Sequence, residues 1–582
     1  MTHRNGRGAP YTWWALVSGL LFASVVRGRS VSTDAAPAAA PCRCFPGDAC
    51  WPDEKAWAEL NSTVDGRLIA TVPLASVCHG TNTYSEKGCA DLRAAWPNPD
   101  THIDSTSSVM APFYANESCS PFSAREAPCV VGAYVQYAVD ATHPSHYQKT
   151  LAFAAEHNIR LVVRNTAHDW LGKSTGAGGL AIRTHNYKGV EVLDYESEHY
   201  TGKALKMFAG TQFRDAFQAA HDQGLVVVGG TCPSVGIAGG YTQGGGHGLT
   251  VSALGLGADQ VLEWEVVTAD GEIVKASPKT NPDLYWALSG GGGGTFGVVI
   301  ALTVKAHQDR ITAGANLTWT NEGITQDKYY EAIRLYISSL PPLLDAGATS
   351  TWLNNNATFS VSPAVGFGMS KEDLDALHQP LLDELDKLEI KYTYYSADFP
   401  TFLDFYHDMN PFTETATFQL GSRLIPRKVV LNAAEDFAHT LQEITDEHDG
   451  AWISGVSFNV SRAPDVPNAV NPAFRDASVS LVVGTLYDYY KTENNAALQQ
   501  LMTDVFVPKL AALIDGGGSA YLNEGDPNEQ EWQKVFYGEN YQRLLEIKNR
   551  YDPDRVFYGR TAVGSEAWAE SKDGRLCRKD RD

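Results

Sequence analysis

The chain has 582 residues, of which 43% are hydrophobic and 20% are charged, and its formal net charge is −22 at pH 7. A chain of this length exceeds what one hydrophobic core usually fills, so we expect two domains or one large domain with another inserted in it. The acidic balance argues against binding to nucleic acid or to an anionic membrane surface, because neutralising phosphate needs clustered Lys and Arg.

The first thirty residues have the pattern of a secretory signal peptide. Arg4 and Arg7 precede an apolar run at 13–26, and small residues follow it. The run is too short for a comfortable membrane span, and no later stretch is longer. We therefore expect residues 1–30 to be removed and the mature protein to be secreted, with no membrane association; an uncleaved N-terminal anchor is the alternative.

Nine cysteines cannot all pair within one molecule, so at least one is free. Cys232 stands apart, because it lies in a glycine-rich segment from Gly230 to Gly248 where backbone can approach a ligand closely. The other eight suit an exported protein with up to four disulfides, whose pairing the spacing leaves open. These eight are Cys42, Cys44, Cys50, Cys78, Cys89, Cys119, Cys129 and Cys577.

Two further patterns concern modification and metals. Five sequons predict N-linked glycans in the same compartment, at Asn61, Asn116, Asn316, Asn356 and Asn459. The Cys42-Arg-Cys44 pair lacks suitably spaced histidines, so we expect no metal site.

A Cys-rich segment over 31–124 precedes a region with an α+β pattern. A strand is predicted at 130–139, a helix at 147–157 and a short strand at 159–163. A second helix is predicted over 213–223, closed by a glycine that suits a helix C-terminus.

A strand at 225–228 follows that helix, and the strongest hairpin signal then lies at 261–276. Its turn is Asp270-Gly271, flanked by apolar runs. The next element begins at Asn281-Pro-Asp, which predicts a helix capped by the Asn281 side chain. From residue 311 to about 500, longer helical patterns alternate with strands, which indicates a second, mixed domain.

Two glycine motifs in the chain are misleading. Gly292 to Gly297 matches the dinucleotide pattern, but a predicted helix precedes it and a β-branched run follows, the reverse of what a Rossmann site needs. Gly172 to Gly176 matches the G-x-S-x-G pattern, but no helix opens after it, so no nucleophile elbow is expected.

Four stretches occur together: around His168, around Cys232, at 281–297 and at 540–557. In this combination they resemble the flavin-binding half of the vanillyl-alcohol oxidase and p-cresol methylhydroxylase (PCMH) superfamily, in its berberine bridge enzyme-like branch. The ending from Thr561 to Cys577 is similar to a secreted fungal subgroup that includes isoamyl alcohol oxidases.

The resemblance implies an α+β fold with three parts after the Cys-rich segment. Residues 125–310 would form a PCMH-type FAD-binding domain of two subdomains. Residues 311–500 would form an inserted, mixed α/β substrate domain, and residues 501–582 would return to the flavin domain.

The resemblance also implies FAD attached by two covalent bonds, from His168 to the 8-methyl carbon and from Cys232 to C6 of the isoalloxazine. Two bonds would fix the ring and raise its potential as a hydride acceptor. A merely hydrogen-bonded histidine and a free thiol are the alternatives. The implied cofactor-binding residues are His168, Cys232, Arg164, Asn165, Thr166, Ala167, Asp169, Gly172, Ser174, Val235, Gly236, Gly240, Gly244, Gly245, Gly246, Gly297 and Val298.

One departure from the family lies directly before His168. Relatives usually have glycine there, whereas this chain has Thr166 and Ala167. The phosphate turn is therefore expected to be tighter or differently hydrated.

The second departure concerns the catalytic base. Relatives commonly have a tyrosine where the run from Tyr521 to Asp526 has Glu524. A buried carboxylate with a raised pKa can take an alcohol proton as hydride leaves, although a salt-bridged acid is the alternative. Tyr241, His247 and Tyr537 are further candidates.

Taken together, these patterns predict a secreted FAD-dependent oxidase that acts on a small alcohol-type molecule and passes electrons to O2, giving H2O2. Val235 favours O2 as acceptor, because it matches a valine that accompanies oxygen access in the family. An oxidative cyclase or dehydrogenase of secondary metabolism, and a non-catalytic flavin-carrying binding protein, are the alternatives.

Overall fold

Strand β3 (Leu161–Arg164) pairs in parallel with β4 (Leu180–Arg183), and the loop between them carries His168. In this computed structural model, residues 42–80, 82–410 and 414–579 are described, and the signal-peptide prediction lies outside them. The strands of the first sheet pair in the order β1 (Leu68–Ala70), β2 (Tyr137–Asp140), β4 (Leu180–Arg183) and β3 (Leu161–Arg164). Helix α4 (Pro144–Glu156) connects β2 to β3, so the apolar runs of both strands are buried beneath it.

A second, antiparallel sheet continues this half of the fold. Its order is β5 (Val190–Glu196), β6 (Thr201–Phe208), β10 (Val298–Lys305), β8 (Val261–Val267) and β9 (Ile273–Ala276). The hairpin prediction is confirmed: β8 pairs with β9, and Gly271 in the turn has φ +84°, which glycine adopts without strain. The dinucleotide reading of 292–297 is excluded here too, since helix α8 (Pro282–Leu288) precedes the glycines and strand β10 follows them.

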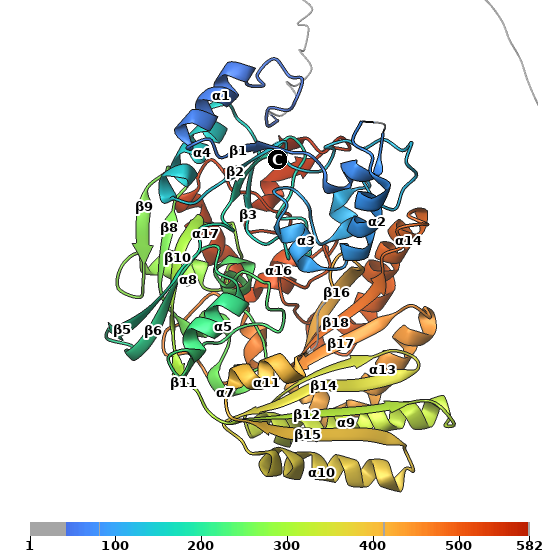
Figure 1. Ribbon diagram of the computed structural model, residues 1–582. Helices are drawn as coiled ribbons and strands as arrows, with labels where there is room; N and C mark the ends of the chain where they lie inside the picture. The colour runs from blue at the N-terminus through green and yellow to red at the C-terminus, as the bar shows by residue number, and fades with distance from the viewer. Residues whose placement is uncertain (1–41, 81, 411–413, 580–582) are drawn as a thin grey trace, which may run out of the picture. The chain divides into compact units, whose positions relative to one another are not determined.

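A large antiparallel sheet is inserted after β11 (His307–Gln308). Its strands run in the order β15 (Tyr392–Phe399), β12 (Thr312–Thr320), β14 (Thr358–Phe367), β13 (Thr349–Asn354), β17 (Trp452–Ser457), β18 (Ala477–Leu486) and β16 (Phe418–Pro426). Its helices pack together in one hydrophobic core with this sheet (Figure 1): α9 (Gln326–Asp345), α10 (Lys371–Lys387) and α13 (Ala434–Glu447). We call residues 312–514 the inserted layer.

The inserted layer ends later than the sequence indicates. Met502, Phe506, Leu510 and Ile514, from the π-turn η6 (Met502–Phe506) onward, are buried in the core of the large sheet. The predicted boundary at residue 500 therefore falls too early, because the apolar side chains after it pack in the core of the inserted layer. The chain returns to the first half only afterwards, where α16 (Trp532–Tyr537) and α17 (Tyr541–Tyr551) join the core that contains α8.

Two local predictions fail for identifiable reasons. The strand predicted at 130–139 begins only at Tyr137, because Gly132 takes φ +53° and turns the chain beside Ser118. Asn281 does precede α8, but it has φ +47° and its side chain donates to the Lys275 carbonyl instead of capping the helix.

Four disulfides are present among the described residues, as the cysteine count allows. They join Cys42 to Cys577, Cys44 to Cys50, Cys78 to Cys89 and Cys119 to Cys129. Cys232 is the free cysteine of the described chain and is buried. The pairing therefore separates one free cysteine from eight that form disulfides.

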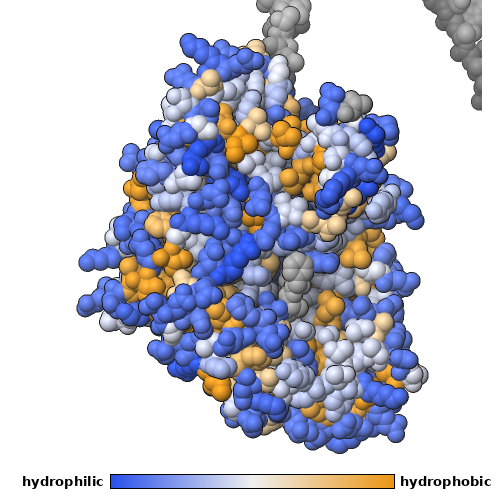
Figure 2. Space-filling view, in the orientation of Figure 1, coloured by the Kyte–Doolittle hydropathy of each residue, from blue (hydrophilic) through white to orange (hydrophobic). Residues whose placement is uncertain are grey.

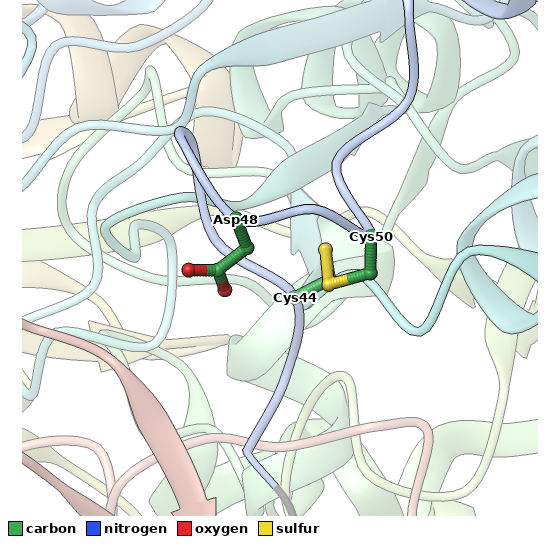
Figure 3. A group of neighbouring side chains, drawn as sticks. All are labelled: Cys44, Asp48 and Cys50. Carbon is green, nitrogen blue, oxygen red and sulfur yellow. A yellow bond between two sulfur atoms is a disulfide. The ribbon is translucent and has the colours of Figure 1, made fainter.

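Cys44, Asp48 and Cys50 form a cluster that resembles a metal site by proximity alone (Figure 3). Their ligand atoms lie within 4.8 Å of one another. Both sulfurs are consumed by a disulfide, however, and the Asp48 carboxylate is paired with the Arg575 guanidinium. The cluster therefore offers no thiolate ligand.

Hydrophilic side chains predominate on the face of the molecule in Figure 2, as the composition predicts. Across the described residues, no helix has both the length and the apolarity that a bilayer span requires.

Buried histidines should make the fold sensitive to acid. Burial lowers the pKa of His102, His185 and His307 to about 4 and that of His168 to about 3, in each case mainly by desolvation. Below the unfolded value of about 6.5, the unfolded chain binds more protons than the folded one. The free energy of unfolding should therefore fall between pH about 6.5 and 4, by up to about 1.4 kcal/mol per pH unit for each such histidine.

Denaturant titrations across this pH range measure that slope. The variant His307→Gln should show a shallower slope than the wild type, since one of the titrating rings is gone. Equal slopes for the two proteins would contradict the assignment.

Candidate active site

A cavity of about 350 Å3 is enclosed by loops from both halves of the chain. The β3–β4 loop, the Cys232 segment, the 293–299 segment and the element after residue 520 all line it, and Thr415 contributes from the inserted layer. Helix α11 (Phe402–Met409) of that layer also contacts the Cys232 segment, because the Tyr406 hydroxyl donates to the Thr231 carbonyl at 2.6 Å.

The β3–β4 loop places five consecutive predicted residues, Asn165 to Asp169, on the cavity wall. Ala167 has φ +62° and is almost fully buried. The turn therefore takes a left-handed conformation that glycine adopts without strain, at the steric cost of a Cβ atom. The departure from glycine before His168 thus shows itself as backbone strain at Ala167.

Arg164 was predicted to bind the cofactor, but its side chain lies outside the cavity lining. The guanidinium donates to the carbonyl oxygens of His102, Ser105, Ser108 and Ser174. Burial lowers the pKa of Arg164 to about 9. Its role is to join the N-terminal segment to the loop, because a buried charge needs these acceptors.

Asp169 lines the cavity, yet its carboxylate is used within the loop. Oδ1 accepts from the Leu171 N–H and Oδ2 from the Ser174 N–H, both at 3.1 Å. These two bonds close the turn, and Ser174 reaches the cavity wall on its far side. Gly172 shapes the same loop from outside the lining: it has φ +77°, and a Cβ there would meet the Tyr114 ring at 2.4 Å.

His168 and Cys232 meet at one end of the cavity. His168 Nε2 lies 3.9 Å from Cys232 Sγ, and the hydroxyl of Ser234 lies between them, 2.8 Å from Nε2 and 3.3 Å from Sγ. Burial lowers the pKa of His168 and raises the pKa of the Cys232 thiol. The imidazole is therefore neutral at ordinary pH.

The predicted small residues divide into two groups. Val235, Gly236, Gly240 and Gly297 line the cavity, and a Cβ at Gly236 would collide with the Asn165 amide at 2.2 Å. Gly244, Gly245, Gly246 and Val298 were predicted to bind cofactor but lie outside the lining. Gly246 instead packs beneath the Tyr241 ring, and Val298 is buried at the start of β10.

Glu524 and His247 are in hydrogen-bond contact in the same cavity. His247 Nε2 lies 3.0 Å from Oε1 and 3.1 Å from Oε2 of Glu524. Tyr241 also lines the cavity, and its hydroxyl is buried without a partner among the described residues. Tyr537 does not reach the cavity: it is buried in α16 and donates to the Thr561 carbonyl at 2.9 Å, which removes it as a catalytic candidate.

Several lining residues were missed by sequence reasoning. Lys173 is the sole lysine in the described lining, which contains no arginine, and burial lowers its pKa. The others include Trp170, Gln243, Tyr521, Asn523 and Tyr558. Lys173, Tyr521 and Asn523 lie within motifs that the sequence analysis had already singled out. Their closeness in sequence to predicted site residues could therefore have pointed to them.

Unpaired polar atoms in the cavity wall show that the cavity suits a flavin. Asn165 Oδ1, Tyr241 OH, Gln243 Oε1 and His247 Nδ1 belong to lining residues, are buried, and have no hydrogen-bond partner within the described protein. Buried polar atoms are seldom left unpaired, and the heteroatoms of an isoalloxazine can pair with them. Lys173 can balance the charge of a diphosphate.

Comparison with known proteins gives the same answer. A model of the FAD binding domain matches residues 135–277, and a berberine and berberine-like model matches residues 520–564. The FAD-linked oxidoreductase sor8 of Hypocrea jecorina is 50% identical over 538 residues, which is 92% of this chain and 93% of that protein.

Two crystal structures extend the comparison. The VAO-type flavoprotein MtVAO615 from Myceliophthora thermophila C1 superposes with a TM-score of 0.89 at 39% identity, over 93% of this chain and all of that one. Glucooligosaccharide oxidase from Acremonium strictum, described with a 6-S-cysteinyl, 8α-N1-histidyl FAD, shares the fold with a TM-score of 0.62 at 21% identity, over 74% of this chain and 92% of that one.

The fold and the cavity thus define a flavin-dependent oxidoreductase with an inserted layer over its flavin-binding half. More closely, the chain belongs to the berberine bridge enzyme-like branch of the VAO/PCMH superfamily, which confirms the resemblance found in the sequence.

Relieving the strain at Ala167 should stabilise the protein. We expect Ala167→Gly to raise the free energy of unfolding by about 0.5–1 kcal/mol, since a Cβ in the left-handed region costs roughly 1–2 kcal/mol and glycine returns part of that as unfolded-chain entropy. Ala177→Gly in the same loop is the control, because Ala177 is outside the positive-φ set, and it should destabilise. Denaturant unfolding measures both; a loss of stability in Ala167→Gly would refute the strain.

Lys173 should contribute to cofactor affinity. With His168→Ala and Cys232→Ala as background, so that FAD binds without a covalent bond, Lys173→Met should raise the Kd for FAD about tenfold, through loss of a charge-assisted contact. Lys173→Arg keeps the cation and should bind nearly as before. Fluorescence titration gives the Kd, and equal affinities for Met and Lys would exclude the role.

Proposed function

We propose that the protein is a secreted oxidase that takes a hydride from the alcohol carbon of a small molecule, with FAD attached to His168 and Cys232 and with dioxygen as acceptor. The single observation that carries this proposal is the Glu524 carboxylate, held by His247, in the cavity that also contains both anchor residues. When bound, FAD accepts the hydride and returns two electrons to dioxygen, giving H2O2.

Glu524 is the best-placed base in the described lining. Burial raises the pKa of Tyr241 and of Tyr521, and the nearby Glu524 charge raises the pKa of Tyr521 further. Both phenols therefore stay protonated at neutral pH. Asp169, the other carboxylate of the lining, already accepts two loop N–H groups, whereas Glu524 is half-buried and bound to a side chain.

His247 orients this base and limits its freedom. Its Nε2–H reaches both oxygens of Glu524, which fixes the plane of the carboxylate. Its ring lies 5.1 Å from that of Tyr521, edge to face, and its Nδ1 has no partner in the described protein. A carboxylate so held can accept the substrate hydroxyl proton while the carbon–hydrogen bond breaks.

Attachment at two positions is supported by the 3.9 Å separation of His168 Nε2 and Cys232 Sγ. The glucooligosaccharide oxidase structure carries the same pair of linkage types. Val235 on the cavity wall supports dioxygen as acceptor, and the four disulfides support export and, with it, N-glycans at the sequons.

Glu524→Gln keeps the shape of the side chain and removes its basicity. We expect it to slow anaerobic reduction of the flavin by about 10²- to 10⁴-fold, the range of a lost general base, with a small change in KM. A panel of alcohols, sugars and phenols is first screened for a substrate that makes the wild type release peroxide. Stopped-flow absorbance of the flavin, after anaerobic mixing with that substrate, then measures the reduction rate.

Tyr537→Phe is the matched control, because it removes a buried hydroxyl outside the cavity and should leave the reduction rate intact. Reduction of the Glu524→Gln flavin at the wild-type rate would exclude Glu524 as base. Reduction of the wild-type flavin without peroxide release would favour the cyclase or dehydrogenase alternative, and absence of reduction by any panel member would favour the binding protein.

A further inference from the structure

We propose that Ser234 is a positioning residue that prepares both anchors for their bonds to the flavin: it fixes the tautomer of His168 and stabilises the thiolate of Cys232. This role rests on the covalent attachment proposed above. Beyond that attachment, the role of Ser234 explains how one site prepares two different nucleophiles.

The hydroxyl of Ser234 is the group closest to both anchors. Its Oγ lies 2.8 Å from His168 Nε2 and 3.3 Å from Cys232 Sγ, whereas the two anchors are 3.9 Å apart. Ser234 is 3% exposed and Cys232 9%. Bulk water therefore has little access to this contact.

The fold fixes the position of the hydroxyl. The Ser234 carbonyl accepts from Gln212 Nε2 at 2.7 Å, the Arg214 N–H donates to the Pro233 carbonyl at 3.0 Å, and the Phe213 N–H donates to the Val235 carbonyl at 3.0 Å. These bonds hold the segment against the start of helix α5 (Phe213–His221). The serine side chain is thus set by backbone contacts on both sides.

One hydroxyl proton permits two chains of hydrogen bonds. If Ser234 donates to His168 Nε2, the thiol must donate to Oγ, so the sulfur keeps its proton and Nδ1 carries the ring proton. If His168 Nε2–H donates to Oγ, the hydroxyl donates to Sγ. The Nδ1 lone pair is then free and a thiolate receives a hydrogen bond, so only this second arrangement readies both nucleophiles.

The surrounding groups act on both anchors. Burial lowers the pKa of His168, and the Arg214 charge lowers it further, so the ring is neutral and carries one N–H, as both arrangements require. Burial raises the pKa of Cys232, and the hydrogen bond from Ser234 and the Arg214 charge oppose that rise, so Ser234 favours the thiolate in the second arrangement. Arg214 is itself paired with Asp100 at 2.6 Å.

Both attachments balance with dioxygen as the oxidant. At His168, the Nδ1–carbon bond forms at the ring-8 methyl group, one methyl C–H bond breaks, and the Nε2 proton leaves through the Ser234 hydroxyl. At Cys232, the sulfur–carbon bond forms at C6, the C6–H bond breaks, and the thiol proton is lost. Each attachment thus removes two protons and two electrons, which convert one O2 to one H2O2.

The test follows covalent attachment rather than turnover. Full-length protein produced under riboflavin limitation is incubated with FAD in air, and samples are precipitated with acid at intervals. Flavin retained in the pellet gives the attachment rate, and peptide mass mapping assigns it to His168 and to Cys232. In Ser234→Ala, the attachment rate at both positions should fall about tenfold, the factor expected when a hydrogen bond to a charged group is lost.

Two variants separate this role from general folding. Ser234→Thr keeps the hydroxyl and should restore most of the rate. Ser457→Ala removes an equally buried hydroxyl in the inserted layer, where it accepts from Trp352 Nε1 at 3.0 Å, and should attach flavin as the wild type does.

The outcomes are distinguishable. Wild-type attachment in Ser234→Ala at both positions would overturn the role of Ser234 while leaving the covalent flavin intact. Absence of pellet flavin in the wild type would overturn covalent attachment itself and this role with it.

Discussion

Burial of the Arg164 guanidinium determines where the rest of the site lies. A charged group that is 1% exposed has to be satisfied by acceptors, and the acceptors are carbonyl oxygens from two separate segments, residues 102–108 and Ser174. The N-terminal segment and the β3–β4 loop are therefore tied at one point. In the sequence, His168 lies between Arg164 and Ser174, which are hydrogen-bonded to each other. The position of His168 against Cys232 therefore depends on how this one cation is accommodated.

The electrostatics of the cavity suit hydride transfer more than ion binding. Its described lining contains one lysine and two carboxylates, of which only Glu524 is bound to another side chain instead of the loop backbone. His168 is neutral, and the tyrosines stay protonated because burial raises their pKa values. In the proposed reaction, a wall with so few charges would leave Glu524 as the main group that meets the developing charge of the alcohol.

Sequence reasoning singled out His168 and Cys232, which the structure brings together, because each lies in a compact motif whose neighbours can be read directly. It placed the helix at 213–223 and the 261–276 hairpin close to their observed bounds, since their periodicity and turn chemistry are local. It did not foresee that Arg164 bonds to carbonyl oxygens 10 to 62 residues away or that Tyr537 bonds to one 24 residues away, and it missed Tyr558, because such contacts depend on the tertiary fold. It also misplaced the boundary at 500, where the apolar pattern does not show which of two cores it fills.

The Cys42–Cys577 bond spans a sequence separation of 535 residues, and it closes the described chain into a ring. Because the two cysteines lie so far apart in the sequence, the bond can form only after residue 577 has been synthesised and both thiols have been oxidised. A single cut of the backbone anywhere between residues 42 and 577 would therefore leave the two pieces covalently joined through this bond.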